Sequence, residues 1–201
     1  MASTVEIVNR ALQHIGVARI ADLDEAGKAA REAKAAWDGV RRATLAGHPW
    51  NFAIVRTSLA ASATAPAWGY AAAYPVPVGP DPAACLRVLE VDGEGDGETG
   101  DPWRLETVQG VGLAIVTDLG APLYVRYVGD VSNAAQLAPA FAELLALDLA
   151  LALQPTLAPS RVDIDRLKAA RKEALQDARF VDGAEGSREL VIADEWLEAR
   201  Y

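Results

Sequence analysis

A run of 17 residues, Leu137–Leu153, contains only two charged side chains, Glu143 and Asp148, and is apolar around the whole circumference of a helix. A helix of that kind has to be enclosed on most sides. The run is shorter than the ~20 apolar residues that span a bilayer, and it carries two acids. We therefore predict a buried core helix over 137–154 that ends at Pro155, with other elements packed around it.

The hydrophobic period predicts three further helices, over residues 3–16, 24–45 and 160–180. Ser3 and Glu6 match a capping box at the start of the first helix. Asp24 is the predicted N-cap of the second, and Ser160 with Asp163 caps the last. The two helices before residue 50 and the two after residue 133 therefore flank a middle section of different character.

The middle section has the signals of β-structure. Its short segments are rich in Val, Ile, Tyr and Trp and are separated by Gly, Pro and Asp, which is typical of strands joined by turns. The predicted strands are Asn51–Leu59, Trp68–Tyr74, Leu86–Val91, Trp103–Val108, Leu113–Asp118 and Pro122–Val128. In the last of these, alternate residues Leu123, Val125 and Tyr127 are apolar, as expected of a strand with one buried face.

These elements predict an α+β fold. We expect a four-helix bundle of two N-terminal and two C-terminal helices, with a small antiparallel β lobe inserted and an extended C-terminal tail. The predicted boundaries are 1–48 and 133–181 for the helical bundle, 49–132 for the β-rich lobe and 182–201 for the tail, which is expected to act as a docking segment.

Charge is distributed unevenly along the 201 residues, whose formal net charge is −9. Residues 81–106 hold eight acids and two bases, and residues 182–201 hold six acids and two bases, whereas the rest is close to neutral. A chain without a cationic face does not fit a conventional nucleic-acid-binding protein. The single cysteine, Cys85, excludes an intramolecular disulfide and favours synthesis in a reducing compartment, and the N-terminus has no evident signal peptide.

No pattern in the sequence indicates catalysis, a cofactor or a metal. The acidic stretch Asp92–Asp101 resembles a calcium loop in its first positions, but Trp103 stands where the bidentate Glu is needed, so we expect an exposed hairpin loop. His14 and His48 have no nucleophile near them in sequence. Glu143 and Asp148 are the only candidates for a glycosidase pair, and their spacing on a helix directs them about 140° apart.

Aromatic residues are the remaining signal. Those of the middle section are expected to fill a core, or alternatively to bind a ligand: Trp50, Trp68, Tyr70, Tyr74, Tyr124 and Tyr127. The C-terminal Trp-Leu-Glu-Ala-Arg-Tyr segment carries large apolar side chains that its own acidic surroundings cannot bury. Two interpretations stay open for this segment: it docks on another molecule, or it folds back on its own helices.

Several strings occur in order along nearly the whole chain: Ile7-Val-Asn-Arg-Ala-Leu, Ile15-Gly-Val-Ala-Arg-Ile, Ala30-Arg-Glu, Val40-Arg-Arg, His48-Pro-Trp-Asn-Phe-Ala, Pro66-Ala-Trp-Gly-Tyr, Cys85-Leu-Arg-Val-Leu, Pro122-Leu-Tyr-Val-Arg-Tyr-Val and Trp196-Leu-Glu-Ala-Arg-Tyr. Together they resemble the tail tubular protein A family of bacteriophage head-to-tail adaptors. The acidic loop 92–101 is a departure from that family and inherits no role from it.

The resemblance implies a structural virion protein rather than an enzyme. It implies a ring of twelve copies under the portal protein, at the head–tail junction, assembled in the host cytoplasm. Such a ring extends the channel for double-stranded DNA without binding it specifically, and carries the downstream tail or nozzle protein. No membrane and no cofactor is implied.

The resemblance also assigns roles to residues. The motif positions with a structural role are His48, Pro49, Trp50, Asn51, Phe52, Trp68, Gly69 and Tyr70. The expected interface to the portal or a neighbouring subunit is Trp196, Leu197, Arg200 and Tyr201. Two alternatives stay open: a virion-associated peptidoglycan hydrolase that uses Glu143 and Asp148, and a monomeric binding module that uses the aromatic β section.

Overall fold

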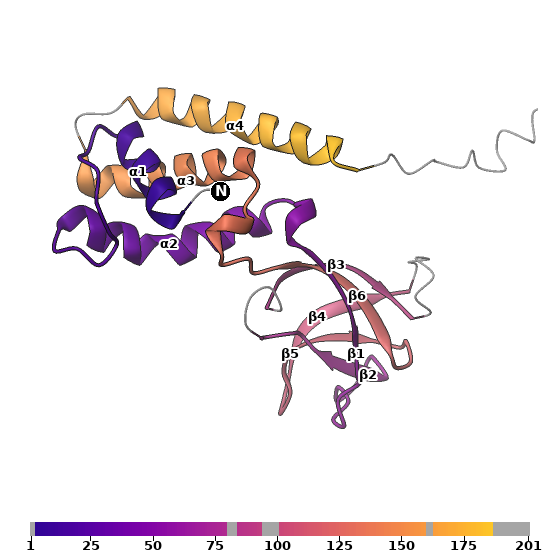
Figure 1. Ribbon diagram of the computed structural model, residues 1–201. Helices are drawn as coiled ribbons and strands as arrows, with labels where there is room; N and C mark the ends of the chain where they lie inside the picture. Colours follow the sequence, from indigo (N-terminus) through magenta and orange to yellow (C-terminus); the bar gives the residue numbers. More distant parts are fainter. Residues whose placement is uncertain (1–2, 80–83, 94–100, 160–162, 187–201) are drawn as a thin grey trace, which may run out of the picture.

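The computed structural model describes residues 3–79, 84–93, 101–159 and 163–186. It contains a helical unit and a β unit, joined by the segments before the first strand and after the last (Figure 1). The helices are α1 (Thr4–His14), α2 (Lys28–Ala46), α3 (Pro139–Leu157) and α4 (Ile164–Ala184), with short 3-10 turns η1 (Asn51–Ala53) and η2 (Ala134–Gln136). The strands are β1 (Ile54–Leu59), β2 (Ala72–Pro75), β3 (Cys85–Asp92), β4 (Trp103–Val108), β5 (Gly112–Thr117) and β6 (Leu123–Gly129).

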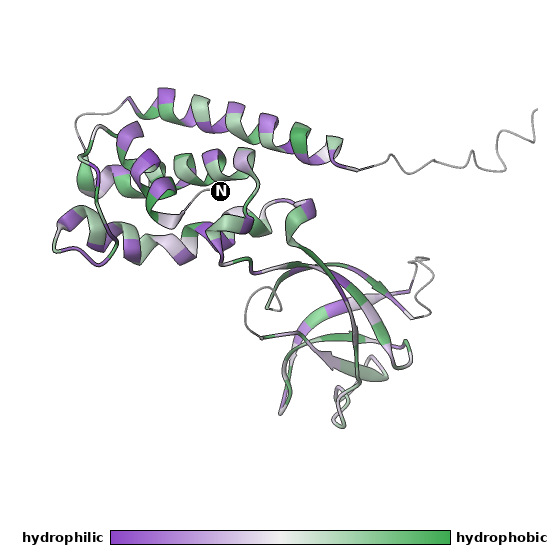
Figure 2. Ribbon diagram, viewed as in Figure 1, coloured by the Kyte–Doolittle hydropathy of each residue, from purple (hydrophilic) through white to green (hydrophobic). Residues whose placement is uncertain are grey.

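The helical unit is organised around α3. This helix packs against α1, α2 and α4, and all the main helix–helix contacts of the described chain involve it. Most of its leucines and alanines are buried, whereas α4 alternates hydrophobic and hydrophilic residues along its length (Figure 2). Length and composition alone would let α3 cross a bilayer, and it is the one described helix of that kind; here most of its apolar surface lies inside the protein.

The β unit consists of two antiparallel sheets of three strands. In sheet A the central strand β6 pairs with β1 and β3, and in sheet B the central strand β5 pairs with β2 and β4. The sheets enclose a core of their own, to which β6 contributes Leu123, Val125 and Tyr127 as its alternation predicts. At the upper end of sheet A, Val128 belongs to the helical core instead, so the two units share a packed boundary.

The predicted four-helix bundle with a small β lobe is wrong. The helices surround α3 rather than packing as a bundle, because α3 is apolar all round and offers contact surface to three partners. The β part is a two-sheet unit with its own core rather than a small lobe. Hydrophobic period shows which residues are buried, but not against which element they are buried.

Local predictions have mixed outcomes. The capping box is confirmed, since the Ser3 and Glu6 side chains each accept from the other residue's backbone N–H. Helix α2 begins later than predicted, with Gly27 rather than Asp24 as N-cap, and α3 continues through Pro155 to Leu157. Residues 92–101 join β3 of sheet A to β4 of sheet B, so the connection is not a hairpin. The Ser160 prediction lies outside the described residues, and Asp163 does cap α4.

Candidate partner interface

The His-Pro-Trp-Asn-Phe motif forms the turn that carries the chain from α2 into β1. Trp50 is 1% exposed, and its indole N–H donates to the Thr44 carbonyl at 3.2 Å. The Trp50 ring lies edge-on to Phe141 of α3, with centroids 5.1 Å apart, and Phe52 contacts the same ring. Pro49, exposed between His48 and Trp50, fixes the backbone of the turn. The motif therefore attaches the first strand to the central helix.

The same motif holds the end of α4. The backbone N–H of Asn51 donates to Asp182 Oδ1 at 2.8 Å, and its side-chain amide donates to the Asp182 carbonyl at 2.6 Å. His48 Nε2 lies 3.3 Å from the other carboxylate oxygen of Asp182, which is itself buried. The turn before β1 and the last turn of α4, 131 residues apart in the sequence, are thus joined. This contact fixes the last turn of α4 against the turn between α2 and β1.

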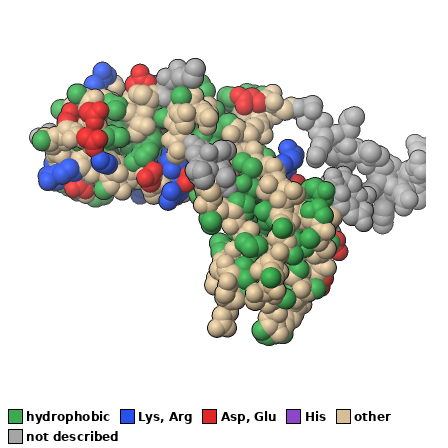
Figure 3. All heavy atoms as spheres, turned by 60° about the horizontal axis from the view of Figure 1, so that its bottom comes forward, with side chains coloured by type: hydrophobic (Ala, Val, Ile, Leu, Met, Phe, Trp, Pro, Cys, Tyr) green, Lys and Arg blue, Asp and Glu red, His purple; other side chains and the backbone are tan. Residues whose placement is uncertain are grey.

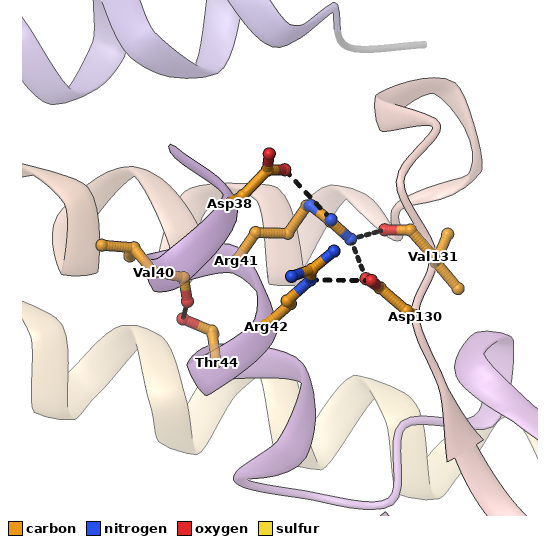
Figure 4. Close-up of polar contacts among 7 residues, drawn as sticks. All are labelled: Asp38, Val40, Arg41, Arg42, Thr44, Asp130 and Val131. Atoms are coloured by element: carbon orange, nitrogen blue, oxygen red, sulfur yellow. Dashed lines mark hydrogen bonds and ion pairs between the residues drawn. The ribbon is translucent and has the colours of Figure 1, made fainter. Parts of the chain in front are cut away.

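A second polar joint connects the two units (Figure 4). Arg41 of α2, 1% exposed, donates to the Asp130 carboxylate and to the Val131 carbonyl just after β6, the latter at 2.6 Å. Arg42 donates to the other Asp130 oxygen at 2.8 Å, and Asp38 accepts from Arg41 at 3.2 Å. A buried charge that loses its partner is strongly destabilising. Because Arg41 of α2 is buried against Asp130 and Val131 after β6, this joint holds the helical unit in place relative to sheet A.

Sequence reasoning missed this joint, although a signal was present. Arg41 falls on the buried stripe of α2, which also contains Ala30, Ala33, Trp37 and Thr44. A charged side chain at such a position indicates a buried ion pair, but the sequence does not name its partner 89 residues away.

The Trp-Gly-Tyr motif lies at the other end of the molecule, in the loop between β1 and β2 that is farthest from the helices (Figure 1). Trp68 is 87% exposed, Gly69 has the positive φ of 91° that favours glycine, and Tyr70 packs on sheet B. An open groove beside this loop is lined by Pro66, Trp68, Tyr70, Arg104, Val108 and Asp118.

The loop side of this groove is free of charge, whereas Arg104, Glu106 and Asp118 line its sheet B side. Residues 57–80 contain no acid and no base. Seen from this end, the β unit shows hydrophobic side chains and little charge, whereas acids and bases gather over the helices (Figure 3). An exposed tryptophan beside an open groove is typical of a site where another protein docks.

The two acids considered for catalysis lie on different sides of α3. Glu143 pairs with Arg10 at 2.8 Å and His14 at 3.1 Å, both on α1. Asp148 instead accepts from Thr44 of α2 at 2.9 Å and from Arg171 of α4 at 2.7 Å. Each carboxylate is therefore engaged in joining helices, and the two do not face a common site.

The other titratable groups of the described ranges form no catalytic arrangement. Burial raises the pKa of the Cys85 thiol to about 11 and raises the pKa of Tyr74, whose hydroxyl donates to the Leu119 carbonyl at 2.8 Å. The pKa of Tyr127 is raised mainly by burial as well. These groups belong to the β core, and a protonated thiol is a poor nucleophile. Within the described ranges, no group of three metal-ligating side chains occurs.

The aromatic residues divide between core and surface. Trp50, Tyr74 and Tyr127 are buried, as core packing predicts, whereas Trp68 and Tyr124 are exposed. The predicted interface residues Trp196, Leu197, Arg200 and Tyr201 lie outside the described residues, as does most of the acidic loop 92–101.

Comparison with known proteins adds no relative. No protein-family model matches the chain, and no curated protein matches it.

Proposed function

We propose that this chain is a head-to-tail adaptor of a bacteriophage virion, a structural subunit that forms a ring of twelve copies under the portal. The observation that carries the proposal is the contact of the His-Pro-Trp-Asn-Phe motif with Asp182. The most specific string of the family resemblance is thus the one that holds the end of α4, the helix that precedes the C-terminal segment. A segment that carries Trp196, Leu197 and Tyr201 is suited to docking on a neighbour or on the portal.

The distribution of charge supports the same role. Each neutralised phosphate strengthens binding to DNA, so a channel subunit that lets DNA pass should lack an uncompensated basic face. The arginines Arg10, Arg41, Arg42 and Arg171 are all paired with carboxylates. Subunits of a ring meet head to tail, so an arm of one copy docks on the next without self-complementarity.

The groove beside Trp68 suits the attachment of the downstream tail protein. It lies at the opposite end of the molecule from the helices, and Pro66, Trp68 and Tyr70 offer apolar area to a partner (Figure 3). Under this proposal, the helical end and the C-terminal segment serve the portal and the neighbouring copies, while the β unit serves the tail.

Electron microscopy and native mass spectrometry of the full chain, alone and mixed with the portal protein of the same particle, test the proposal. We expect rings, and we expect Trp196→Ala with Tyr201→Ala to weaken them, whereas Ser187→Ala serves as the matched control in the same segment. Removal of residues 187–201 should leave the helical circular dichroism unchanged while assembly is lost. A full chain that stays monomeric and unbound in the presence of the portal would contradict the proposal.

A further inference from the structure

Strand β4 is the least protected edge of the two sheets. Among the described strands it pairs with β5 alone, and its other edge has no strand beside it. The four consecutive residues 104–107 are exposed, so side chains on both faces of the strand are open to solvent. The register with β5 is continuous from Trp103 to Val108, and the strand contains no proline. A regular, exposed edge of this kind is a template for another strand.

The other edge strands of the described sheets are less suited to such pairing. Strand β2 has four residues and ends in Pro75, and its Ala73 carbonyl accepts from the Ser62 N–H at 2.8 Å. The register of β3 with β6 shifts at two places. Short strands, prolines and irregular register all hinder edge-to-edge pairing. Strand β1 carries Arg56 as its only charged residue, so a second copy of it offers no acid in return.

Strand β4 carries one charge of each sign on its outer face. Arg104 and Glu106 alternate with Val108 along this face, and Val108 packs in the small cluster on the outside of sheet B. Neither Arg104 nor Glu106 forms an ion pair with a described residue. The nearest further acid of the groove, Asp118, already accepts from the Ala71 N–H at 2.8 Å. Both charges of β4 are therefore available to a partner strand.

A second copy of β4 is the strand whose charges match. In an antiparallel pair with a two-fold axis at Leu105, Arg104 of each copy lies directly opposite Glu106 of the other copy. Opposite charges in directly opposed positions stabilise a strand pair. A slip of two residues in either direction brings Arg104 or Glu106 against its own equivalent, and like charges there repel. The charges therefore favour one register.

The other face of the pair is apolar at its centre. Leu105 is 44% exposed and meets its own equivalent on the two-fold axis. Leu113 of β5, 50% exposed, lies opposite Thr107 and so shares the face of Leu105. Removing these leucines from water favours association. One six-residue strand still offers less surface than the ~800 Å² per partner of a stable interface, so we expect a weak dimer.

We propose that β4 pairs with β4 of a second copy in this antiparallel register, which joins the two copies of sheet B into one continuous sheet. A two-fold contact is isologous, so it differs from the head-to-tail contacts of a closed ring and goes beyond the proposed function. Arg104 and Glu106 also line the groove beside Trp68. The paired copy and a bound tail protein therefore compete for this edge.

A cysteine on the two-fold axis tests the pairing in the full chain. Cys85 is the only cysteine, so Cys85→Ala with Leu105→Cys leaves a single thiol. That thiol lies opposite its own equivalent at the ~5 Å Cβ separation of opposed residues, which is close to the spacing that a disulfide needs. Cys85→Ala with Leu113→Cys is the matched control, because Leu113 is similarly exposed but its two copies lie three strands apart, about 14 Å.

Covalent dimers, counted on a denaturing gel during mild oxidation, are the readout. We expect the Leu105→Cys variant to form them at least about tenfold faster than the Leu113→Cys variant, because pairing holds its thiols at high effective concentration. The covalent bond also traps a dimer that is too weak to persist on dilution. Equal rates for the two variants would overturn the proposal.

Charge variants in the Leu105→Cys background test the register. Arg104→Glu and Glu106→Arg each place like charges opposite one another at two positions, so each should slow dimer formation about tenfold. Arg104→Glu combined with Glu106→Arg exchanges the charges and restores both opposite pairs, so it should recover most of the rate. All of these side chains are exposed, and the substitutions leave the core unchanged. A combined variant as slow as the single ones would refute the proposed register.

Electron microscopy of the same samples scores ring formation separately. Rings without rapid cross-linking of the Leu105→Cys variant would overturn the strand pairing and leave the adaptor proposal intact. Rapid cross-linking without rings, in the presence of the portal protein, would support the strand pairing and contradict the adaptor proposal.

Discussion

Replacement of Asp130 by Asn should destabilise the protein more than any other single loss of charge in the joint between the two units. The change keeps the side-chain shape but removes the negative charge that serves both Arg41 and Arg42. Arg41 is 1% exposed, so its guanidinium then remains buried without a carboxylate other than the exposed Asp38. Loss of one partner of a buried ion pair costs about 3–5 kcal/mol.

The lower end of that range applies here. Arg41 keeps its bond to the Val131 carbonyl and its contact with Asp38, so we expect a loss of about 3 kcal/mol in the free energy of unfolding. For a chain of this length, each kcal/mol shifts Tm by roughly 2–4 °C, which predicts a Tm lowered by about 6–12 °C. Urea unfolding followed by circular dichroism, together with a thermal scan, measures both quantities.

Two variants make the test specific. Asp38→Asn, at a 68% exposed carboxylate, should change the free energy of unfolding by less than about 0.5 kcal/mol. The double variant Arg41→Met with Asp130→Leu removes both charges and should recover much of the loss, because an apolar pair avoids the cost of desolvating ions. If Asp130→Asn melts within about 2 °C of the wild type, or if the double variant is the less stable one, the buried-pair reasoning is wrong.

Two further predictions concern the aromatic motifs and the cysteine. Trp50→Ala should cost about 3–5 kcal/mol in urea unfolding because a fully buried ring is lost, whereas Trp68→Ala at 87% exposure should stay within about 0.5 kcal/mol; similar values for both would contradict the division into core and surface. Burial raises the pKa of Cys85 to about 11, so the thiol stays protonated in the native chain at a pH where it ionises in the unfolded chain. Labelling by iodoacetamide near pH 9 should therefore be slower in the native than in the urea-unfolded chain. The stabilisation that Cys85 gives below its unfolded pKa should be lost as pH rises toward 11.

Elements whose residues carry their own pattern were predictable. Ser3 and Glu6 define the start of α1 by bonds within one turn, and the alternation Leu123, Val125, Tyr127 defines β6 by contrast between its faces. The all-round apolar surface of α3 likewise required a central position. The contact of the turn motif could not be predicted, since the sequence His-Pro-Trp-Asn-Phe does not indicate that its residues bind Asp182.

The identity of the elements and the buried or exposed state of most apolar residues follow from local sequence, because propensity, capping and periodicity act over a few neighbouring positions. The pairing of those elements does not. That three helices pack on α3, that β3 and β4 belong to different sheets, and that Arg41 finds Asp130 were decided by contacts between residues far apart in the chain. Whether a helix or strand face is buried follows from the residues on that face. Which other element covers the face depends on how all the apolar faces of the chain are covered together, and this is decided only when the whole chain packs.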